Sequence, residues 1–166
     1  NLVETIFGKT IAMADVAFLS SRAILAPKNE DVFKINKDIL NRLEGPSRVF
    51  TSADSIFSDN TGEAQEYPIE YLHGLTPSGM PLHNLELKVG AIVMLLRNFC
   101  SARGLCNGTR LIIETMQNNL IIANVLTGRS KGQTVFTPRI NLVPSEGSSP
   151  VPFKRRQFPL ALAFCM

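Results

Sequence analysis

The hydrophobic positions in the first half of the chain predict a strand followed by a helix. Residues 22–26 form a short apolar run that predicts a buried strand, and residues 30–43 repeat apolar positions at helical spacing. Asn29 is suited to cap that helix, and Gly45 and Pro46 end it. The predicted buried face consists of Val32, Ile35, Ile39 and Leu43. A strand–loop–helix unit is the building block of an α/β fold, which we therefore expect here.

The remainder of this half carries weaker patterns. Residues 1–21 predict short helices at most. Residues 48–55 predict another strand, and the polar residues 56–66 predict a surface loop. Residues 67–75 favour a short helix, and the turn-forming residues 76–81 favour a tight connection. We expect the α/β domain to continue through these segments.

The second half is a series of short strands. Residues 87–96 predict a strand that is apolar except for Lys88, and a basic loop follows it. The glycines at 90, 104 and 108 are expected to serve backbone geometry, because glycine adopts left-handed conformations at little cost. Further short strands, separated by tight turns, are predicted at residues 111–116, 120–126, 133–138 and 139–143. Such a run is typical of a small β-barrel.

The chain closes on an apolar run, residues 160–166, which predicts a buried strand. Two domains in series would not leave a lone strand at the end, so we expect a β-module inserted into an α/β domain. The expected divisions are 1–21 (connecting segment), 22–97 (α/β domain, first part), 98–143 (inserted barrel), 144–152 (linker) and 153–166 (return to the α/β domain). Because the chain starts without Met and stops inside an apolar run, we expect a fragment of a longer protein.

The net charge of the chain changes sign near residue 97, close to the expected start of the inserted barrel. Residues 1–96 hold 8 Lys and Arg against 12 Asp and Glu, whereas residues 97–166 hold 9 against 2. These net charges of −4 and +7 give the +3 of the whole chain. A basic half attracts phosphate and favours nucleic acid as a partner, although an uneven solvated surface is the alternative. No apolar run reaches the roughly 18 residues that a membrane span needs, so no membrane association is expected.

The cysteines and histidines do not predict a catalytic or metal site. Cys100, Cys106 and Cys165 lack the close spacing of a zinc site, and His73 and His83 lie far from them in sequence. Neither histidine has a carboxylate or nucleophile at suggestive spacing. Scattered free thiols favour a structural role in a reducing compartment.

A Gly-Lys-Thr string at residues 8–10 resembles part of a phosphate-binding loop. The full pattern, GxxxxGK[ST], requires another glycine five residues before Gly8, and Val3 occupies that position. Without it the glycine-rich cradle for phosphates cannot form. We therefore expect no ATP-binding loop there.

Three strings carry a family resemblance: RAILAPKNEDVFKINKDIL, LKVGAIVMLLRNFCSARGLCNGTRL and FKRRQFPLALAFCM. Together they resemble the C-terminal half of the helicases related to Helitron transposons and to the petite-integration-frequency (PIF-type) DNA helicases, over residues 22–166. The resemblance implies a partial RecA-like motor domain, the second of two, with an SH3-like barrel inserted at residues 98–143. It also implies a superfamily 1 enzyme that moves 5′ to 3′ on single-stranded DNA, with ATP and Mg²⁺ as cofactors.

The same resemblance implies that the residues that bind and hydrolyse ATP lie elsewhere in the parent protein. The phosphate-binding loop and the Mg²⁺-binding acidic motif belong to the first motor domain, so this chain alone is expected to bind neither cofactor and not to hydrolyse ATP. Its expected partners are single-stranded DNA and that first motor domain. The expected compartment is the nucleus, with the mitochondrion as an alternative. Roles in DNA repair, recombination, telomere maintenance or transposition stay open.

Single-strand binders combine a cationic track with surfaces on which bases stack. The candidate DNA-binding residues are Pro27, Lys28, Asn29, Arg97, Arg103, Arg129, Lys131, Lys154, Arg155 and Arg156. The alternative for Arg129 and Lys131 is a solvated turn. Phe153 and Phe158 flank the last three candidates and are expected to pack in the core rather than stack on bases. A standalone nucleic-acid-binding module and an inactive transposon-derived remnant remain alternative functions.

Overall fold

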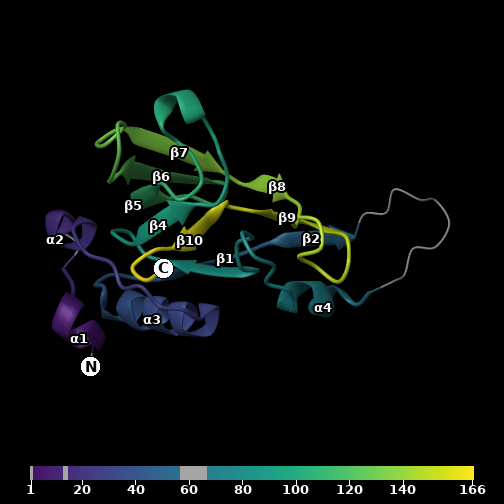
Figure 1. Ribbon diagram of the computed structural model, residues 1–166, viewed down its shortest axis with the longest axis horizontal. Helices are drawn as coiled ribbons and strands as arrows, with labels where there is room; N and C mark the ends of the chain where they lie inside the picture. Colours follow the sequence, from purple (N-terminus) through teal and green to yellow (C-terminus); the bar gives the residue numbers. More distant parts are fainter. Residues whose placement is uncertain (1, 13–14, 57–66) are drawn as a thin grey trace.

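The computed structural model describes residues 2–12, 15–56 and 67–166. The longest helix, α3 (Asn29–Arg42), runs along the lower side of the molecule in Figure 1, beneath the sheets. The shorter helices are α1 (Leu2–Phe7), α2 (Val16–Ser20) and α4 (Ile69–Gly74). No helix in the described part of the chain is long and apolar enough to cross a membrane.

Helix α3 forms where the apolar spacing predicts it. Its first turn carries two carboxylates, which complement the helix dipole, and Ile39 and Leu40 are fully buried. The cap differs from the prediction. Asn29 is the first helical residue, while Lys28 takes the N-cap position without a side-chain capping bond. The packing of the apolar face, rather than a cap, therefore stabilises this helix.

The largest sheet is antiparallel, in the order β10-β4-β5-β6-β7. Its strands are β4 (Ile92–Leu95), β5 (Arg110–Met116), β6 (Leu120–Val125), β7 (Thr134–Pro138) and β10 (Leu160–Leu162). Figure 1 shows β4, β5, β6 and β7 in the upper part of the molecule, with β10 below β4. The sheet spans the division expected between residues 97 and 98, because β4 precedes it and β5 follows it.

Two smaller sheets connect this upper part to the helices. β1 (Arg48–Thr51) pairs with β3 (Asn84–Leu87). A second sheet has the order β2-β9-β8, with strands β2 (Ala53–Ile56), β9 (Phe153–Gln157) and β8 (Ile140–Leu142). The segment 139–143, which the sequence groups with the barrel, thus pairs with β9 instead.

Three predicted strands are corrected. The strand predicted at 48–55 is two strands in different sheets, because Ser52 breaks it and donates its amide to the His83 carbonyl, at 2.9 Å. The strand predicted at 87–96 is interrupted at Gly90, whose φ of +84° is a left-handed conformation. The strand predicted at 22–26 is only a single parallel bridge between Ile24 and Cys165.

Two hydrophobic clusters hold the described residues together. The larger one joins α1 and α3 to the five-stranded sheet and includes Phe158, as the sequence predicts. The smaller one contains Leu72, Met80, Leu142, Val151 and Phe153, and it packs α4 against the β2-β9-β8 sheet. The loop predicted at 56–66 lies, from residue 57 onward, outside the described residues.

Candidate nucleic-acid interface

Two predicted candidates, Arg103 and Arg129, converge on one open cavity. Arg103 ends the 3-10 helix η1 (Ser101–Arg103), and Arg129 lies on the turn between β6 and β7. The cavity has a volume of about 580 Å³ and is lined by Ala102, Arg103, Arg129, Ser130, Gln133 and Thr134. Both arginines are exposed, and neither forms an ion pair with another described residue. Their guanidinium groups are therefore available to an anion.

The local backbone explains why these two segments meet. The Ser130 hydroxyl donates a hydrogen bond to the Arg103 carbonyl and fixes the turn against η1. Gly104 follows η1 with a φ of +72°, and a side chain there would meet Ser130 Oγ at 3.4 Å. The left-handed conformation therefore favours glycine at this position.

The other predicted candidates lie on separate elements. Lys131 is exposed on the same β6–β7 turn as Arg129. Residues 27–29 are exposed at the start of α3, and no hydrogen bond or ion pair given for the described residues joins them to the cavity. Lys154 and Arg156 point outward from β9, half-buried and exposed respectively. Of the predicted candidates, the structure thus gathers only Arg103 and Arg129 around this cavity.

Arg97 connects segments of the protein rather than facing solvent alone. Its guanidinium donates to the carbonyls of Gly79 and Leu96, both at 2.7 Å, and to that of Val143 at 3.4 Å. These bonds tie the 76–81 turn and the end of β8 to the end of β4. Much of its hydrogen-bonding capacity is therefore used within the protein.

The prediction that Arg155 contacts DNA is wrong, because its side chain is fully buried. Strand β9 alternates, so that Phe153, Arg155 and Gln157 face inward while the two residues between them face out. Arg155 forms an ion pair with Asp54, with 2.8 Å between Nη2 and Oδ2, and both side chains are 0% exposed. A phosphate has no access to this guanidinium.

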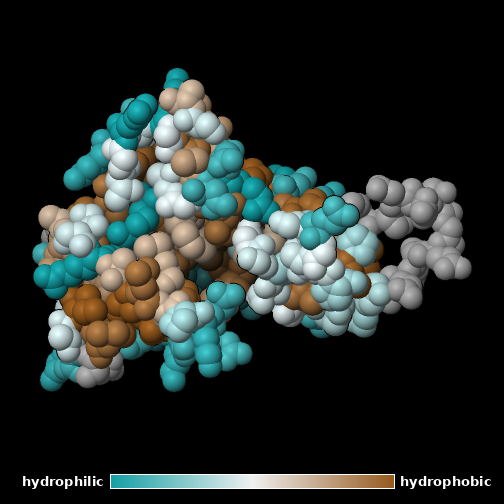
Figure 2. Space-filling view, in the orientation of Figure 1, coloured by the Kyte–Doolittle hydropathy of each residue, from teal (hydrophilic) through white to brown (hydrophobic). Residues whose placement is uncertain are grey.

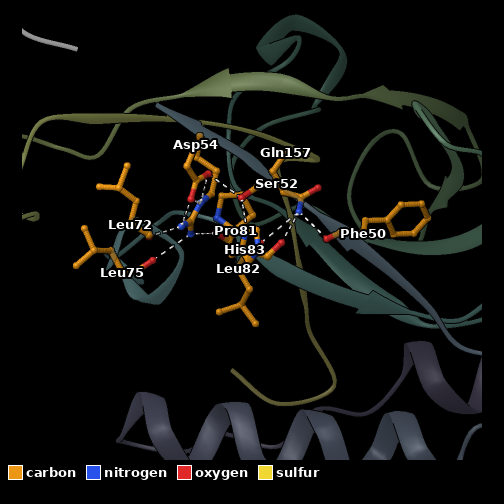
Figure 3. A network of polar contacts seen from close by, with 10 residues as sticks. Phe50, Ser52, Asp54, Leu72, Leu75, Pro81, Leu82, His83 and Gln157 are labelled. Carbon is orange, nitrogen blue, oxygen red and sulfur yellow. Dashed lines mark hydrogen bonds and ion pairs between the residues drawn. The ribbon is translucent and has the colours of Figure 1, made fainter. Parts of the chain in front are cut away.

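The five N–H donors of Arg155 all have acceptors, and Figure 3 labels the residues that supply them, Asp54, Leu72, Leu75 and Pro81. Nε and one Nη2 proton go to the Asp54 carboxylate. The remaining donors reach the backbone carbonyls of Leu72, Leu75 and Pro81, at 2.9–3.0 Å. The network joins β9 and β2 to α4 and to the 76–81 turn, so its role is structural.

Ser52 and His83 extend this network. The Ser52 hydroxyl lies 2.7 Å from Asp54 Oδ1 and 2.8 Å from His83 Nδ1, and the His83 ring stacks on His73 with 3.6 Å between centroids. Burial raises the pKa of Asp54, but hydrogen bonds from Arg155 and Ser52 outweigh it, so this pKa lies below its usual value. Burial, followed by the charge of His73, lowers the pKa of His83.

The ligand atoms of Asp54, His73 and His83 lie within 4.8 Å of one another, a separation that a metal ion could bridge. Their geometry does not suit one. Imidazole lone pairs lie in the ring plane, and two rings stacked 3.6 Å apart at an angle of 7° cannot both aim at a single ion. The carboxylate is also engaged by a guanidinium. We therefore assign no metal to this cluster.

The sequence did not identify two arginines that join the five-stranded sheet to β1. Arg48, on β1, donates to the Met116 carbonyl at 3.0 Å. Arg139 donates to the Asn118 carbonyl at 3.1 Å and to the carbonyl of Thr51, on β1, at 2.8 Å. Burial lowers the pKa of Arg139, and the charges of Arg156 and Arg48 lower it further. No local sequence pattern marks these residues, because their partners are distant in the chain.

Comparisons with known proteins agree with this architecture. Residues 70–116 match the family model for the 2B domain of the DNA helicase Pif1, a range that runs across the division expected at residue 98. No curated protein matches the chain.

Solved structures match over most of the chain. Unliganded Pif1 from Bacteroides sp aligns with a TM-score of 0.61 and 24% identity, over 92% of this chain and 44% of that one. Pif1 from Candida albicans aligns with a TM-score of 0.61 and 21% identity, over 93% of this chain and 39% of that one. Bacteroides Pif1 bound to ssDNA aligns with a TM-score of 0.57 and 22% identity, over 93% of this chain and 35% of that one. The chain thus spans less than half the length of these structures.

These matches define a class: the fold is a mixed helix-and-sheet fold that corresponds to a partial RecA-like domain. Within that class, the chain is similar to the C-terminal portion of Pif1-type DNA helicases. The expected resemblance to Pif1-type helicases and the expected partial RecA-like fold are confirmed.

Proposed function

We propose that the chain is the second motor lobe of an ATP-dependent DNA helicase and that its β-module binds single-stranded DNA. The observation that supports binding is the open cavity between Arg103 and Arg129, where two exposed guanidinium groups face one space. Guanidinium groups bind phosphate through paired hydrogen bonds. A structural relative, Bacteroides Pif1, has been solved with ssDNA bound.

A binding measurement tests this proposal on the 166-residue chain. Fluorescence anisotropy of a labelled oligothymidylate should rise as the chain is added, and the double variant Arg103→Ala/Arg129→Ala should bind more weakly. The matched control is Lys9→Ala/Lys34→Ala, which removes two exposed positive charges on α3 and near α1, and it should bind like the wild type. Absence of binding at low salt would refute the proposal.

The motor activity is proposed for a longer polypeptide, of which this chain supplies one lobe. There, ATP and Mg²⁺ would be held by the first motor domain, and movement would run 5′ to 3′ in the nucleus. A polypeptide that contains both lobes should unwind a duplex with a 5′ single-stranded tail and not one with a 3′ tail. The reverse preference would contradict the proposed polarity.

A further inference from the structure

Phe136 is the most exposed large aromatic side chain in the described part of the protein, at 61%. It lies on β7, where Val135 and Thr137 are buried while Thr134, Phe136 and Pro138 face out. An aromatic ring so exposed buries little apolar surface and contributes little to the core. Its position on a regular strand holds the ring outward, away from the protein.

The outward face of β7 connects this ring to the arginine cavity. Thr134 lines the cavity and faces the same side of β7 as Phe136. Two residues along a strand span about 6.7 Å, close to the rise of two stacked bases at about 3.4 Å each. A phosphate in the cavity and a base on the ring can therefore belong to nucleotides about two steps apart on the same strand.

We propose that Phe136 is a stacking platform for a base of single-stranded DNA whose backbone phosphate lies between Arg103 and Arg129. This inference rests on the proposed DNA binding and adds the position and the mode of contact. Stacking on an aromatic ring tolerates any base, because every base has a π face.

Charge on this face favours a strand of DNA over an apolar protein segment. Arg129 and Lys131 lie on the turn that leads into β7. The acidic residue on the same sheet, Glu114, lies two strands away on β5 and accepts a hydrogen bond from Asn124. A polyanion is thus expected to follow β7 rather than cross the sheet.

Substitution by tryptophan gives a direct reading of the contact. The chain contains no tryptophan, so Phe136→Trp introduces a single tryptophan at the proposed platform, whose emission can be excited separately from that of the two tyrosines. A base stacked on the indole should quench its emission as oligothymidylate is added. The midpoint of this quenching should equal the midpoint of the anisotropy titration. Phe33→Trp, at an exposed position of α3, is the matched control and should not be quenched.

Substitution by leucine measures how much the aromatic ring contributes to DNA-binding affinity. Phe136→Leu keeps an apolar side chain on the strand but removes the π face, so it should weaken binding by about tenfold. With an abasic oligonucleotide, wild type and Phe136→Leu should bind equally, because no base remains to stack.

Three results would overturn the inference. If anisotropy shows binding but the tryptophan emission does not change, the platform is wrong while the proposed function stands. If the emission changes with protein concentration and without DNA, the exposed edge of β7 binds a second copy instead. If neither probe detects DNA, the inference and the proposed function both fail.

Discussion

Arg155 lies between two outward-facing basic residues on β9, and its burial changes the role of the basic triplet. The pattern that distinguishes it is local: Phe153 and Gln157 share its side of the strand, and the apolar Phe153 marks that side as the inner one. The partner, Asp54, is 101 residues away in the sequence. The direction of the side chain was thus predictable from the sequence, whereas its ion pair was not.

Removal of Arg155 should destabilise the protein strongly. Arg155→Ala leaves the Asp54 carboxylate buried and unpaired, which costs about 3–5 kcal/mol. Arg156→Ala, one residue along at an exposed position, should change stability by no more than about 0.5 kcal/mol. Urea unfolding of both variants measures the difference. Equal stability of the two variants would show that the buried pair contributes nothing.

His83 should make the protein less stable in mild acid. Its pKa is lowered in the folded state from 6.5, so between that lower pKa and about pH 6.5 the unfolded chain binds more protons. The free energy of unfolding should therefore fall as the pH drops through this window. Asp54, whose pKa is also lowered, contributes stability above its usual pKa of 3.8 that is lost only in stronger acid.

The variant His83→Asn tests this pH dependence. Asparagine can keep the hydrogen bond that Ser52 makes with Nδ1 but cannot be protonated. Urea midpoints measured from pH 7.5 down to pH 5 should fall less steeply for the variant than for the wild type. Parallel curves would mean that another group causes the acid sensitivity.

At the scale of elements, the hydrophobic periodicity predicted the helix and the strands whose formation depends on residues close together in the sequence. Helix α3 and strands β5, β6 and β7 form close to the expected positions, because their apolar patterns are continuous. The break at Ser52 and the pairing of β8 with β9 depend on distant partners and were not predictable. Arg103 and Arg129 were predicted singly, but their convergence depends on Ser130 fixing the turn to η1.

The packing of α3 on the C-terminal segment is also set by a distant partner. The buried Asn36 amide donates to the carbonyls of Leu162 and Cys165 and accepts from the Cys165 amide, at 2.8–3.3 Å. Asn36→Ala should leave these backbone groups unpaired and cost about 1–3 kcal/mol. Asn41→Ala, at an exposed position of the same helix, should be neutral or slightly stabilising. Urea unfolding that shows no difference between them would contradict this role.

At the scale of the whole molecule, the basic half of the chain includes strands β5, β6 and β7 and both arginines of the cavity. Figure 2 shows hydrophilic and apolar side chains mixed over the upper part of one face, and a larger apolar patch at the lower left. Among the described residues, the cavity is bordered by two arginines and sits next to an exposed aromatic ring. This arrangement suits a partner that carries phosphates and bases together.

The salt dependence of DNA binding tests the central claim most directly. The logarithm of the binding constant should fall linearly with the logarithm of salt concentration, with a slope of about 0.7 for each phosphate that the protein contacts. Loss of Arg103 and Arg129 should reduce that slope by about 1.4, whereas loss of Lys9 and Lys34 should leave it unchanged. An equal slope for the wild type and both double variants would contradict the account.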